Sequence, residues 1–206
     1  MSDRSSGPQL PLEELISPEE LKTGIAAMGA ELTGVLQRCA QPPVLVGVLK
    51  GCAFFLADLV RSMDLDVNVD FISISAYSAS VTGSPSGVVR IVKDLDQSVA
   101  GRDVVIVEDI VDTGLTLNYL RRALVERGPK SLRAVTLLDK AARRIVPVPL
   151  EHACFEIPDQ FVIGYGLDFQ SLYRNVPGIV AVTDFPRLVT EPRLLVEGLW
   201  PTERKA

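Results

Sequence analysis

The sequence predicts an α/β fold with a mostly parallel central sheet, flanked by helices and completed by a small lobe. Apolar runs alternate with segments of helical spacing along the first 140 residues, an order typical of parallel strands joined by right-handed crossovers. The run at residues 43–49 is apolar throughout, as expected for a strand buried on both faces. The segment after residue 140 is richer in proline and aromatic residues. We therefore expect one domain over residues 1–206, with residues 1–14 disordered and residues 140–206 supplying most of the small lobe, or hood.

The first elements follow from capping and periodicity. Ser17–Glu20 reads as a capping box with proline at the first helical position, and apolar residues at helical spacing continue this helix to about residue 39. Residues 43–49 predict a buried strand that ends at Lys50–Gly51. The segment 53–63 follows as a helix.

The next elements repeat this order. Residues 67–75 alternate as a strand does, and residues 76–87 are small, polar and glycine-containing, which predicts a long mobile loop. The remaining predicted elements are a strand at 88–92, a strand from Val104, a helix with Leu117, Leu120 and Leu124 on one face, and strands at 132–138, 161–164 and 179–183.

Composition excludes several functional classes. The net charge of −5 argues against nucleic acid or an anionic membrane as the main partner. No apolar run approaches the roughly 20 residues of a membrane span, and the start has no apolar signal region. The three cysteines are expected to be buried and reduced, which favours a cytoplasmic protein. The single histidine, His152, cannot by itself form a histidine metal cluster or a Ser-His-Asp triad, so most hydrolases are excluded.

The stretch VVIVEDIVDTGLTL (Val104–Leu117) carries the strongest functional signal. Glu108 and Asp109 follow four apolar residues, at the end of a strand where open parallel sheets bind ligands. The turn at residues 112–116 offers free amides and two hydroxyls, which predicts an anion cradle. Because carboxylates accept hydrogen bonds from a diol, the combination predicts a ribose 5-phosphate.

A simpler interpretation is a helix cap of the Asp/Thr type with two solvent-facing acids. The glycine-rich patterns of ATP and dinucleotide sites are absent, so those ligands are not favoured.

The same stretch resembles the phosphoribosyl-pyrophosphate signature of type I phosphoribosyltransferases, and its form E-D-I-x-D-T-G-x-T is similar to that of the hypoxanthine-guanine branch. VGVLKG (Val46–Gly51) looks like the pyrophosphate loop of the family, and ISAYSASVTGSPSG occupies the place of its mobile catalytic loop. LLDKAARR and FEIPDQFVIGYGLDF resemble its purine-binding lobe. The resemblance covers roughly residues 15–186 and implies the type I phosphoribosyltransferase fold.

The resemblance implies that a 6-oxopurine nitrogen displaces pyrophosphate from C1 of phosphoribosyl pyrophosphate, with Mg²⁺ required. Glu108 and Asp109 would hold the ribose hydroxyls directly or through Mg²⁺, and Asp112 would act as acid or base near purine N7. The 5-phosphate would be held by Thr113, Gly114, Leu115 (through its amide) and Thr116.

Other segments would complete the sugar-phosphate site. Lys50 and Gly51 would line the pyrophosphate, with a cis peptide bond before the lysine, and Arg174 would contact the same group. Tyr77 would close over the reaction centre with the mobile loop and exclude water. Ala76 stands where relatives commonly have serine, so a hydroxyl contact to pyrophosphate at that position is in doubt.

The base would be read by residues of the hood. Lys140 would donate to the 6-oxo group, which selects against a 6-amino group because lysine cannot accept a hydrogen bond. Phe161 would stack on the base and the Val162 backbone would read its edge, although core packing is the ordinary role of such a phenylalanine. Asp168 would ligate a second Mg²⁺. We expect Arg143–Arg144 to be surface or interface charge.

Three alternatives remain open. The first is a sister specificity, either xanthine-preferring or pyrimidine-directed. Lys140 and the form VEDIVDTG count against uracil, orotate and adenine, whereas xanthine is not excluded. A regulatory RNA-binding protein with this fold is disfavoured by the acidic balance and by the complete set of catalytic-type residues. A response-regulator-like phosphoacceptor would need further acids and a lysine loop that the sequence does not place. Relatives assemble as dimers or tetramers, so a homo-oligomer is expected.

Overall fold

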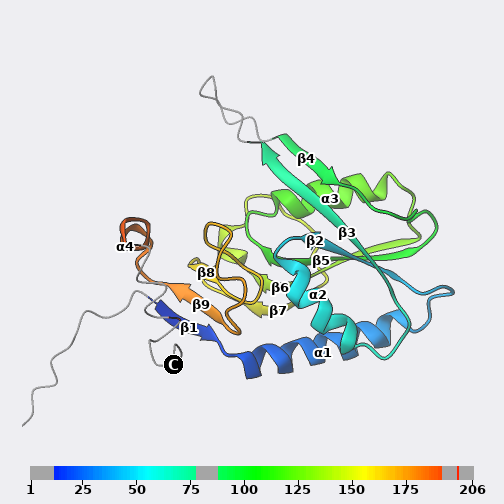
Figure 1. The fold of residues 1–206 in the computed structure, drawn as a ribbon. Helices are drawn as coiled ribbons and strands as arrows, with labels where there is room; N and C mark the ends of the chain where they lie inside the picture. Colours follow the sequence, from blue (N-terminus) through cyan, green and yellow to red (C-terminus); the bar gives the residue numbers. More distant parts are fainter. Residues whose placement is uncertain (1–11, 78–87, 192–198, 200–206) are drawn as a thin grey trace, which may run out of the picture. The chain divides into compact units, whose positions relative to one another are not determined.

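The computed structural model describes residues 12–77, 88–191 and 199, and it divides into two compact units, residues 19–159 and residues 1–18 with 160–206. Within the described part of the larger unit, six strands form one sheet in the order β4-β3-β2-β5-β6-β7 (Figure 1). All neighbouring pairs are parallel except β3 and β4. The predicted mostly parallel sheet is therefore confirmed. The strands are β2 (Val44–Leu49), β3 (Asn68–Tyr77), β4 (Val88–Lys93), β5 (Asp103–Val111), β6 (Ser131–Asp139) and β7 (His152–Glu156).

Helices cover both faces of this sheet. Leu117, Leu120 and Leu124 of α3 (Leu115–Val125) share a buried cluster with alternate residues of β2 and β5. Gly47 points to the opposite face of β2, because a Cβ placed there would meet Leu56 and Cys52 of α2 (Cys52–Arg61). The two helices thus pack on opposite faces, and β2 between them is buried on both sides, as the sequence predicts.

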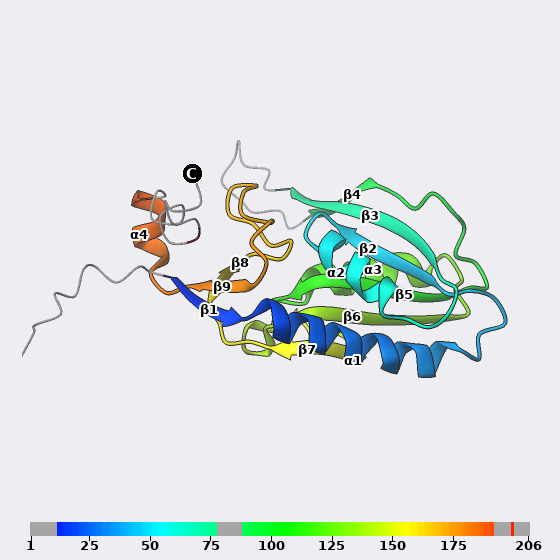
Figure 2. The same ribbon diagram turned by 60° about the horizontal axis from the view of Figure 1, so that its bottom comes forward.

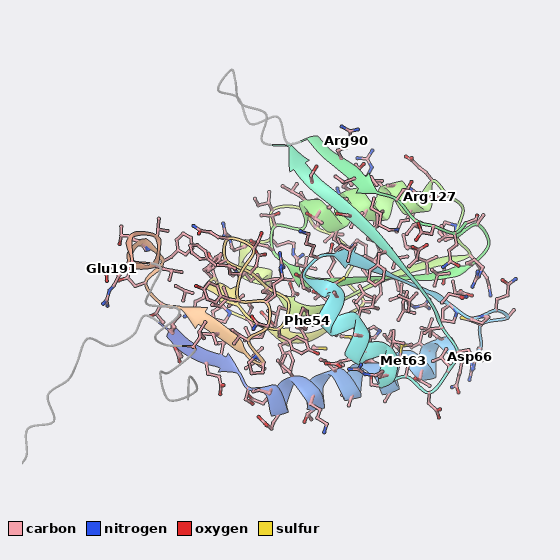
Figure 3. The ribbon with its side chains drawn as sticks, viewed as in Figure 1. Phe54, Met63, Asp66, Arg90, Arg127 and Glu191 are labelled. Carbon is pink, nitrogen blue, oxygen red and sulfur yellow. The ribbon has the colours of Figure 1, made fainter. Side chains whose placement is uncertain are left out.

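The long helix α1 (Pro18–Leu36) begins at the predicted proline and buries one face. It runs alongside β7 (Figure 2), where Gly24 approaches the ring of Phe155, and it meets the end of α2 through a hydrogen bond from Ser62 Oγ to the Ile25 carbonyl. On α2 itself, Phe55 is fully buried whereas Phe54 is 42% exposed (Figure 3). The helix is therefore amphipathic, with its apolar face on the sheet.

The smaller unit is built on a three-stranded antiparallel sheet in the order β1-β9-β8. Its strands are β1 (Leu12–Ile16), β8 (Phe161–Ile163) and β9 (Ile179–Val182), and α4 (Phe185–Thr190) follows them. Ile163, Phe169 and Leu188 contribute to its own buried cluster. The expected disorder of residues 1–14 is wrong for Leu12–Glu14, which pair with β9; residues 1–11 lie outside the described part.

The expected hood of residues 140–206 and this smaller unit share residues 160–206. Residues 140–159 belong instead to the larger unit, where they include η1 (Ala141–Arg143) and β7. His152 is the first residue of β7, and its Nδ1 is 3.0 Å from Glu31 Oε1. A single-domain description of the chain therefore stays a prediction.

The three cysteines all lie in the described part, where none forms a disulfide. Cys52 is buried as expected, whereas Cys39 and Cys154 are partly exposed. Among the described helices, none has the length and apolar character needed to cross a membrane.

Candidate active site

The carboxyl ends of β2 and β5 lie side by side at the point where the order of the sheet reverses. The chain passes from β2 through α2 to β3 on one side, and from β5 through α3 to β6 on the other. Ligands of open parallel sheets bind at such a switch point. Lys50 and Gly51 directly follow β2, and Glu108 and Asp109 lie in the last part of β5. The topology thus brings two separately predicted segments to one place.

Contact between these segments is close. An ideal Cβ at Gly51 would lie 1.5 Å from Asp109 Oδ2, so no side chain fits at this position while Asp109 keeps its place. The ladder between β2 and β5 ends at the pair Gly47 and Val107, just before the two acids. The peptide bond between Leu49 and Lys50 is cis, as the family resemblance implies. Glycine at 51 is therefore a packing requirement of the site.

Glu108 is buried, with 4% of its surface exposed. Its Oε1 has no hydrogen-bond partner among the described residues. Burial raises the pKa of this carboxyl well above its ordinary value, and the charge of Asp109 adds to the effect. The interpretation as two solvent-facing acids is therefore wrong for Glu108. A buried acceptor without a partner is costly, and a ligand hydroxyl or cation would satisfy it.

The turn after β5 packs against the segment that follows η1, and hydrogen bonds join the two. Gly114 has a left-handed φ of 84°, and a Cβ there would lie 2.7 Å from the Val146 carbonyl oxygen. The amides of Ile145 and Val146 both donate to the Thr113 carbonyl, at 3.0 and 3.1 Å. A glycine is required here by backbone conformation and by this contact.

The other side of the turn is open. Gly114 occupies the N-cap position of α3 and provides no side-chain cap. Within the described ranges, the Leu115 amide makes a single long hydrogen bond, of 3.4 Å to Thr113 Oγ1. Leu115 is half-exposed and Thr116 is exposed. Since the first amides of a helix lack partners within the helix, this turn offers donors to an anion, as the sequence predicts.

Asp112 makes a contact that sequence reasoning missed. Arg143 Nε lies 3.4 Å from Asp112 Oδ1, and Arg143 Nη1 lies 3.6 Å from Asp159 Oδ1. We expected Arg143 to be surface or interface charge. Arg144 was expected in the same class, yet it is largely buried and pairs with Asp139. Only the short distance of both arginines from Lys140 in the sequence could have suggested these roles.

Lys140 directly follows β6 and is buried, with 6% exposure. Its amide donates to the Val111 carbonyl at 3.0 Å, which ties the end of β6 to the end of β5. Among the described residues, no carboxylate lies within ion-pair distance of its ammonium group. A buried lysine in this position can donate to a ligand oxygen.

In the smaller unit, the predicted base-binding residues sit on or after β8. The Phe161 ring packs against Phe185 and Phe169, with centroids 4.8 and 6.0 Å apart, and Val162 is buried. Asp168 Oδ1 lies 2.7 Å from Arg174 Nη2. The two residues that were predicted to hold metal and pyrophosphate are therefore paired with each other.

The loop that carries Asp168 has an unusual backbone. Tyr165, Gln170, Ser171 and Tyr173 all have φ between 45° and 70°, a region that residues other than glycine rarely adopt. The Ser171 amide donates to Asp168 Oδ2 at 2.7 Å, which fixes the carboxylate within the loop. Such strain is common at functional sites.

Two predictions concern the expected mobile loop and the metal ligands. Tyr77 is the last residue of β3, and its side chain and the loop at residues 78–87 lie outside the described residues. No group of three or more potential metal-ligating His, Cys, Asp or Glu side chains occurs in the described ranges. The adjacent pair Glu108 and Asp109 is thus the carboxylate pair that the larger unit offers at the switch point.

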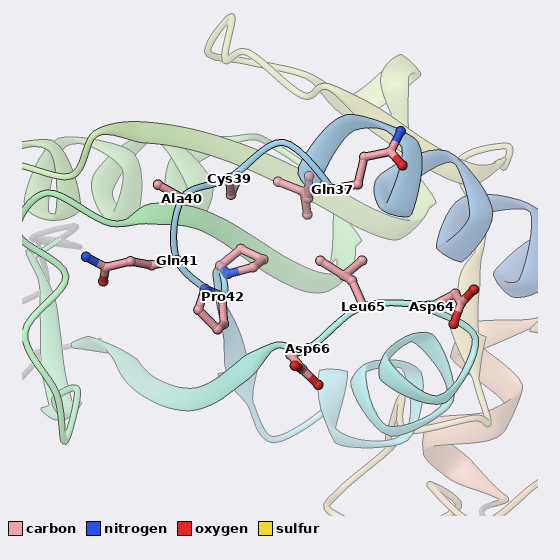
Figure 4. Close-up of a pocket in the computed structure, with 10 residues that line it drawn as sticks. Gln37, Cys39, Ala40, Gln41, Pro42, Asp64, Leu65 and Asp66 are labelled. Atoms are coloured by element: carbon pink, nitrogen blue, oxygen red, sulfur yellow. The ribbon is translucent and has the colours of Figure 1, made fainter.

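A pocket of about 390 Å³ lies elsewhere, beside the amino end of β2 (Figure 4). It is lined by residues 36–37, 39–43 and 64–66, including Cys39, Asp64 and Asp66. Because Lys50 and Gly51 lie at the other end of β2, this pocket is not part of the candidate site.

Comparison with known proteins agrees with the geometry. The family described as Phosphoribosyl transferase domain matches residues 20–170. The hypoxanthine-guanine phosphoribosyltransferase of Bacillus subtilis (strain 168) is 47% identical over 165 residues, which cover 80% of this chain and 89% of that protein. The hypoxanthine phosphoribosyltransferase of Escherichia coli (strain K12) is 45% identical over 168 residues, covering 82% and 93%. A solved structure of Trypanosoma cruzi hypoxanthine phosphoribosyl transferase matches with a TM-score of 0.80 at 39% identity, covering 88% of this chain and 95% of that one.

Proposed function

The chain belongs to the phosphoribosyl transferase family, and we propose on this basis that it transfers a 5-phosphoribosyl group to hypoxanthine or guanine in purine salvage. The donor is phosphoribosyl pyrophosphate and the products are IMP or GMP and pyrophosphate. The observation that carries the proposal is the contact between Gly51 and Asp109, because it joins a pyrophosphate-type loop to a diol-binding acid pair at the switch point.

Catalysis in this site rests on positioning and charge. The bond from C1 to the pyrophosphate oxygen breaks and a bond from C1 to the purine nitrogen forms, through a ribosyl group with oxocarbenium character. Glu108 and Asp109 hold the ribose hydroxyls, and the turn at residues 112–116 holds the 5-phosphate through its amides and hydroxyls. Lys50, Gly51 and Arg174 bind the pyrophosphate. Tyr77 closes over the reaction centre with its loop.

Asp112 exchanges a proton with purine N7 while the glycosidic bond forms. Its Oδ1 is buried beside Arg143, whereas the side chain as a whole is 39% exposed, so a ligand donor can reach the accessible part of the carboxylate. The base is selected by Lys140, which donates to the 6-oxo oxygen, while Phe161 stacks on the ring and the Val162 backbone contacts its edge.

Mg²⁺ is the proposed cofactor. The carboxylates of the site fit a Mg²⁺ ion that binds together with the substrate. Such an ion is commonly held by one or two carboxylates together with phosphate oxygens and water. Glu108 supplies a buried oxygen without a partner among the described residues, and Asp109 lies next to it. Asp168 is the proposed ligand of a second ion. The ion would neutralise charge on the pyrophosphate.

Two broader features belong to the same proposal. The family resemblance supports a homodimer or homotetramer, and the three cysteines without disulfides support a cytoplasmic location. Nucleic acid and membrane are not proposed as partners. The regulatory RNA-binding alternative is not favoured, because the relatives are named as transferases.

The test is a base-by-base screen. Purified protein with Mg²⁺ and phosphoribosyl pyrophosphate is supplied with hypoxanthine, guanine, xanthine, adenine or uracil, and nucleotide formation is followed by absorbance. We expect turnover with hypoxanthine, guanine or both. If xanthine is the preferred base, the protein is a xanthine-preferring phosphoribosyltransferase. If no 6-oxopurine is turned over, the proposed phosphoribosyl transfer is wrong.

A further inference from the structure

We propose that Arg143 is a positioning residue, whose guanidinium holds the Asp112 carboxylate in place for proton exchange with the purine. This inference rests on the proposed function, because it assigns Arg143 a role through Asp112. It concerns a residue whose sequence context indicated only surface or interface charge.

The contact is one of charge rather than of hydrogen bonding. Arg143 Nε lies 3.4 Å from Asp112 Oδ1, yet that oxygen is buried and accepts no hydrogen bond from the described residues. The guanidinium therefore attracts the carboxylate by charge. The Asp112 side chain remains 39% exposed, so the restrained carboxylate can still meet a purine N–H through its accessible part.

Arg143 is itself fixed from two directions. Its Nη1 lies 3.6 Å from Asp159 Oδ1, so the guanidinium stands between two carboxylates. Its backbone belongs to η1, whose first turn is closed by a hydrogen bond from the Arg143 amide to the Lys140 carbonyl at 3.0 Å. The residue that holds Asp112 is thus joined to the residue proposed to read the base.

The backbone couples the same two segments. Directly after Arg144, the amides of Ile145 and Val146 donate to the Thr113 carbonyl, one residue after Asp112. Arg144 pairs with Asp139 and not with Asp112, so Arg143 is the arginine of this pair that faces the proposed acid. The side-chain contact and the backbone contacts together define the position of Asp112 relative to η1.

The expected effect is moderate. The side chains of Arg143 and Asp112 are 49% and 39% exposed, and ion pairs at this exposure contribute little in free energy. We expect Arg143→Gln to lower kcat by roughly two- to fivefold. The KM for phosphoribosyl pyrophosphate should stay near its original value, because the phosphate turn keeps its backbone hydrogen bonds.

The experiment is a double-mutant cycle on the full chain with Asp112→Asn, in which kcat and both KM values are measured. Arg143→Lys should restore part of the lost turnover, since it retains the charge. Arg122→Gln, an exposed arginine on α3, is the control and should match the original protein. In the Asp112→Asn background, Arg143→Gln should cause no further loss, because the carboxylate that it holds has become an amide.

Three outcomes would overturn the inference. They are an unchanged or raised kcat in Arg143→Gln, an equal loss in the Asp112→Asn background, and a loss that appears only in KM for phosphoribosyl pyrophosphate. These differ from a failure of the proposed function, in which the original protein itself forms no nucleotide. Melting temperatures of all variants separate these results from a loss of folded protein.

Discussion

Gly51 and Asp109 are in contact across the ends of β2 and β5, so closely that an ideal Cβ on Gly51 would lie 1.5 Å from Asp109 Oδ2. This relationship joins the two halves of the proposed donor site, the loop for pyrophosphate and the acids for ribose. Neither segment reveals the other in the sequence, since more than fifty positions separate them. The contact leaves no room for a side chain at position 51 while Asp109 keeps its place.

Replacement of Gly51 by alanine should displace Asp109 and disable the site. We expect kcat/KM for phosphoribosyl pyrophosphate to fall by roughly 100-fold, since displacement of a catalytic or binding group by about 1 Å can have an effect of that size. Initial rates at saturating base provide the measurement. Gly34→Ala is the matched control, because a Cβ at Gly34 meets nothing within 4 Å and helical alanine is favourable. Equal activity of Gly51→Ala and Gly34→Ala would show that the contact is irrelevant to function.

Asp112→Asn should lower turnover far more than it weakens binding of the sugar phosphate. An amide cannot take up the purine proton, so we expect kcat to fall by roughly 10²- to 10⁴-fold. Binding of phosphoribosyl pyrophosphate, measured by titration calorimetry, should change little. If turnover and donor binding decrease by the same factor, Asp112 is a binding residue and its proposed chemical role is wrong.

Lys140→Gln should weaken discrimination between 6-oxo and 6-amino purines. Lysine only donates hydrogen bonds, whereas glutamine can also accept one from an amino group. We expect the ratio of kcat/KM for hypoxanthine to that for adenine to fall by at least about tenfold. Lys130→Gln, outside the site, serves as the control. A ratio that stays constant while both rates fall would assign Lys140 to general packing.

Glu108→Gln should raise stability and lower activity. The buried carboxylate has an oxygen without a partner among the described residues and lies next to a second acid, so its charge opposes folding in the absence of ligand. A gain of about 1 kcal/mol, or roughly 3 °C in Tm, is expected near neutral pH. Calorimetry of the metal-free protein measures this, with the exposed Glu126→Gln as control. A lower Tm would show that the carboxylate stabilises the fold.

Asp103, at the amino end of β5, should make stability depend on pH. The hydrogen bond from Ser131 Oγ, at 2.6 Å, holds the pKa of Asp103 below its ordinary value of 3.8. Because the folded state favours the ionised form, its contribution is present above pH 3.8 and is lost as pH falls through the folded pKa.

Asp103→Ala should therefore lower the free energy of unfolding by about 2 kcal/mol near neutral pH. The difference from the original protein should shrink as pH falls from 5 to 3, as followed by urea denaturation. A constant difference over that range would mean that the contribution of Asp103 does not depend on its charge.

Most of the larger unit could be predicted from local pattern, although its strand β7 was not, and the smaller unit could be predicted only in part. Apolar runs and helical spacing locate β2, β5, β6, α1 and α3, since each buries an uninterrupted face. Strand β1 was missed because LEELI has no strand pattern of its own and pairs with β9 at the opposite end of the sequence. Pairing over such a separation leaves no local signal.

In the site, too, some features have a local sequence signal and others do not. Spacing indicated that Glu108 and Asp109 lie at a strand end, yet it could not reveal that Glu108 is buried without a partner among the described residues. Arg143 was missed for a related reason. Its contact with Asp112 depends on a 3₁₀ turn after β6, and an arginine pair in a polar loop has the appearance of surface charge.

The most direct measurement is the stoichiometry of a complete reaction, with hypoxanthine or guanine and phosphoribosyl pyrophosphate in equal amounts in the presence of Mg²⁺. Nucleotide and pyrophosphate are quantified separately. Group transfer at C1 predicts one equivalent of each per base consumed, and it predicts that the rates of formation of both products fall by the same factor in Asp112→Asn. Release of pyrophosphate without nucleotide, or neither product with either base, would contradict the proposed transfer.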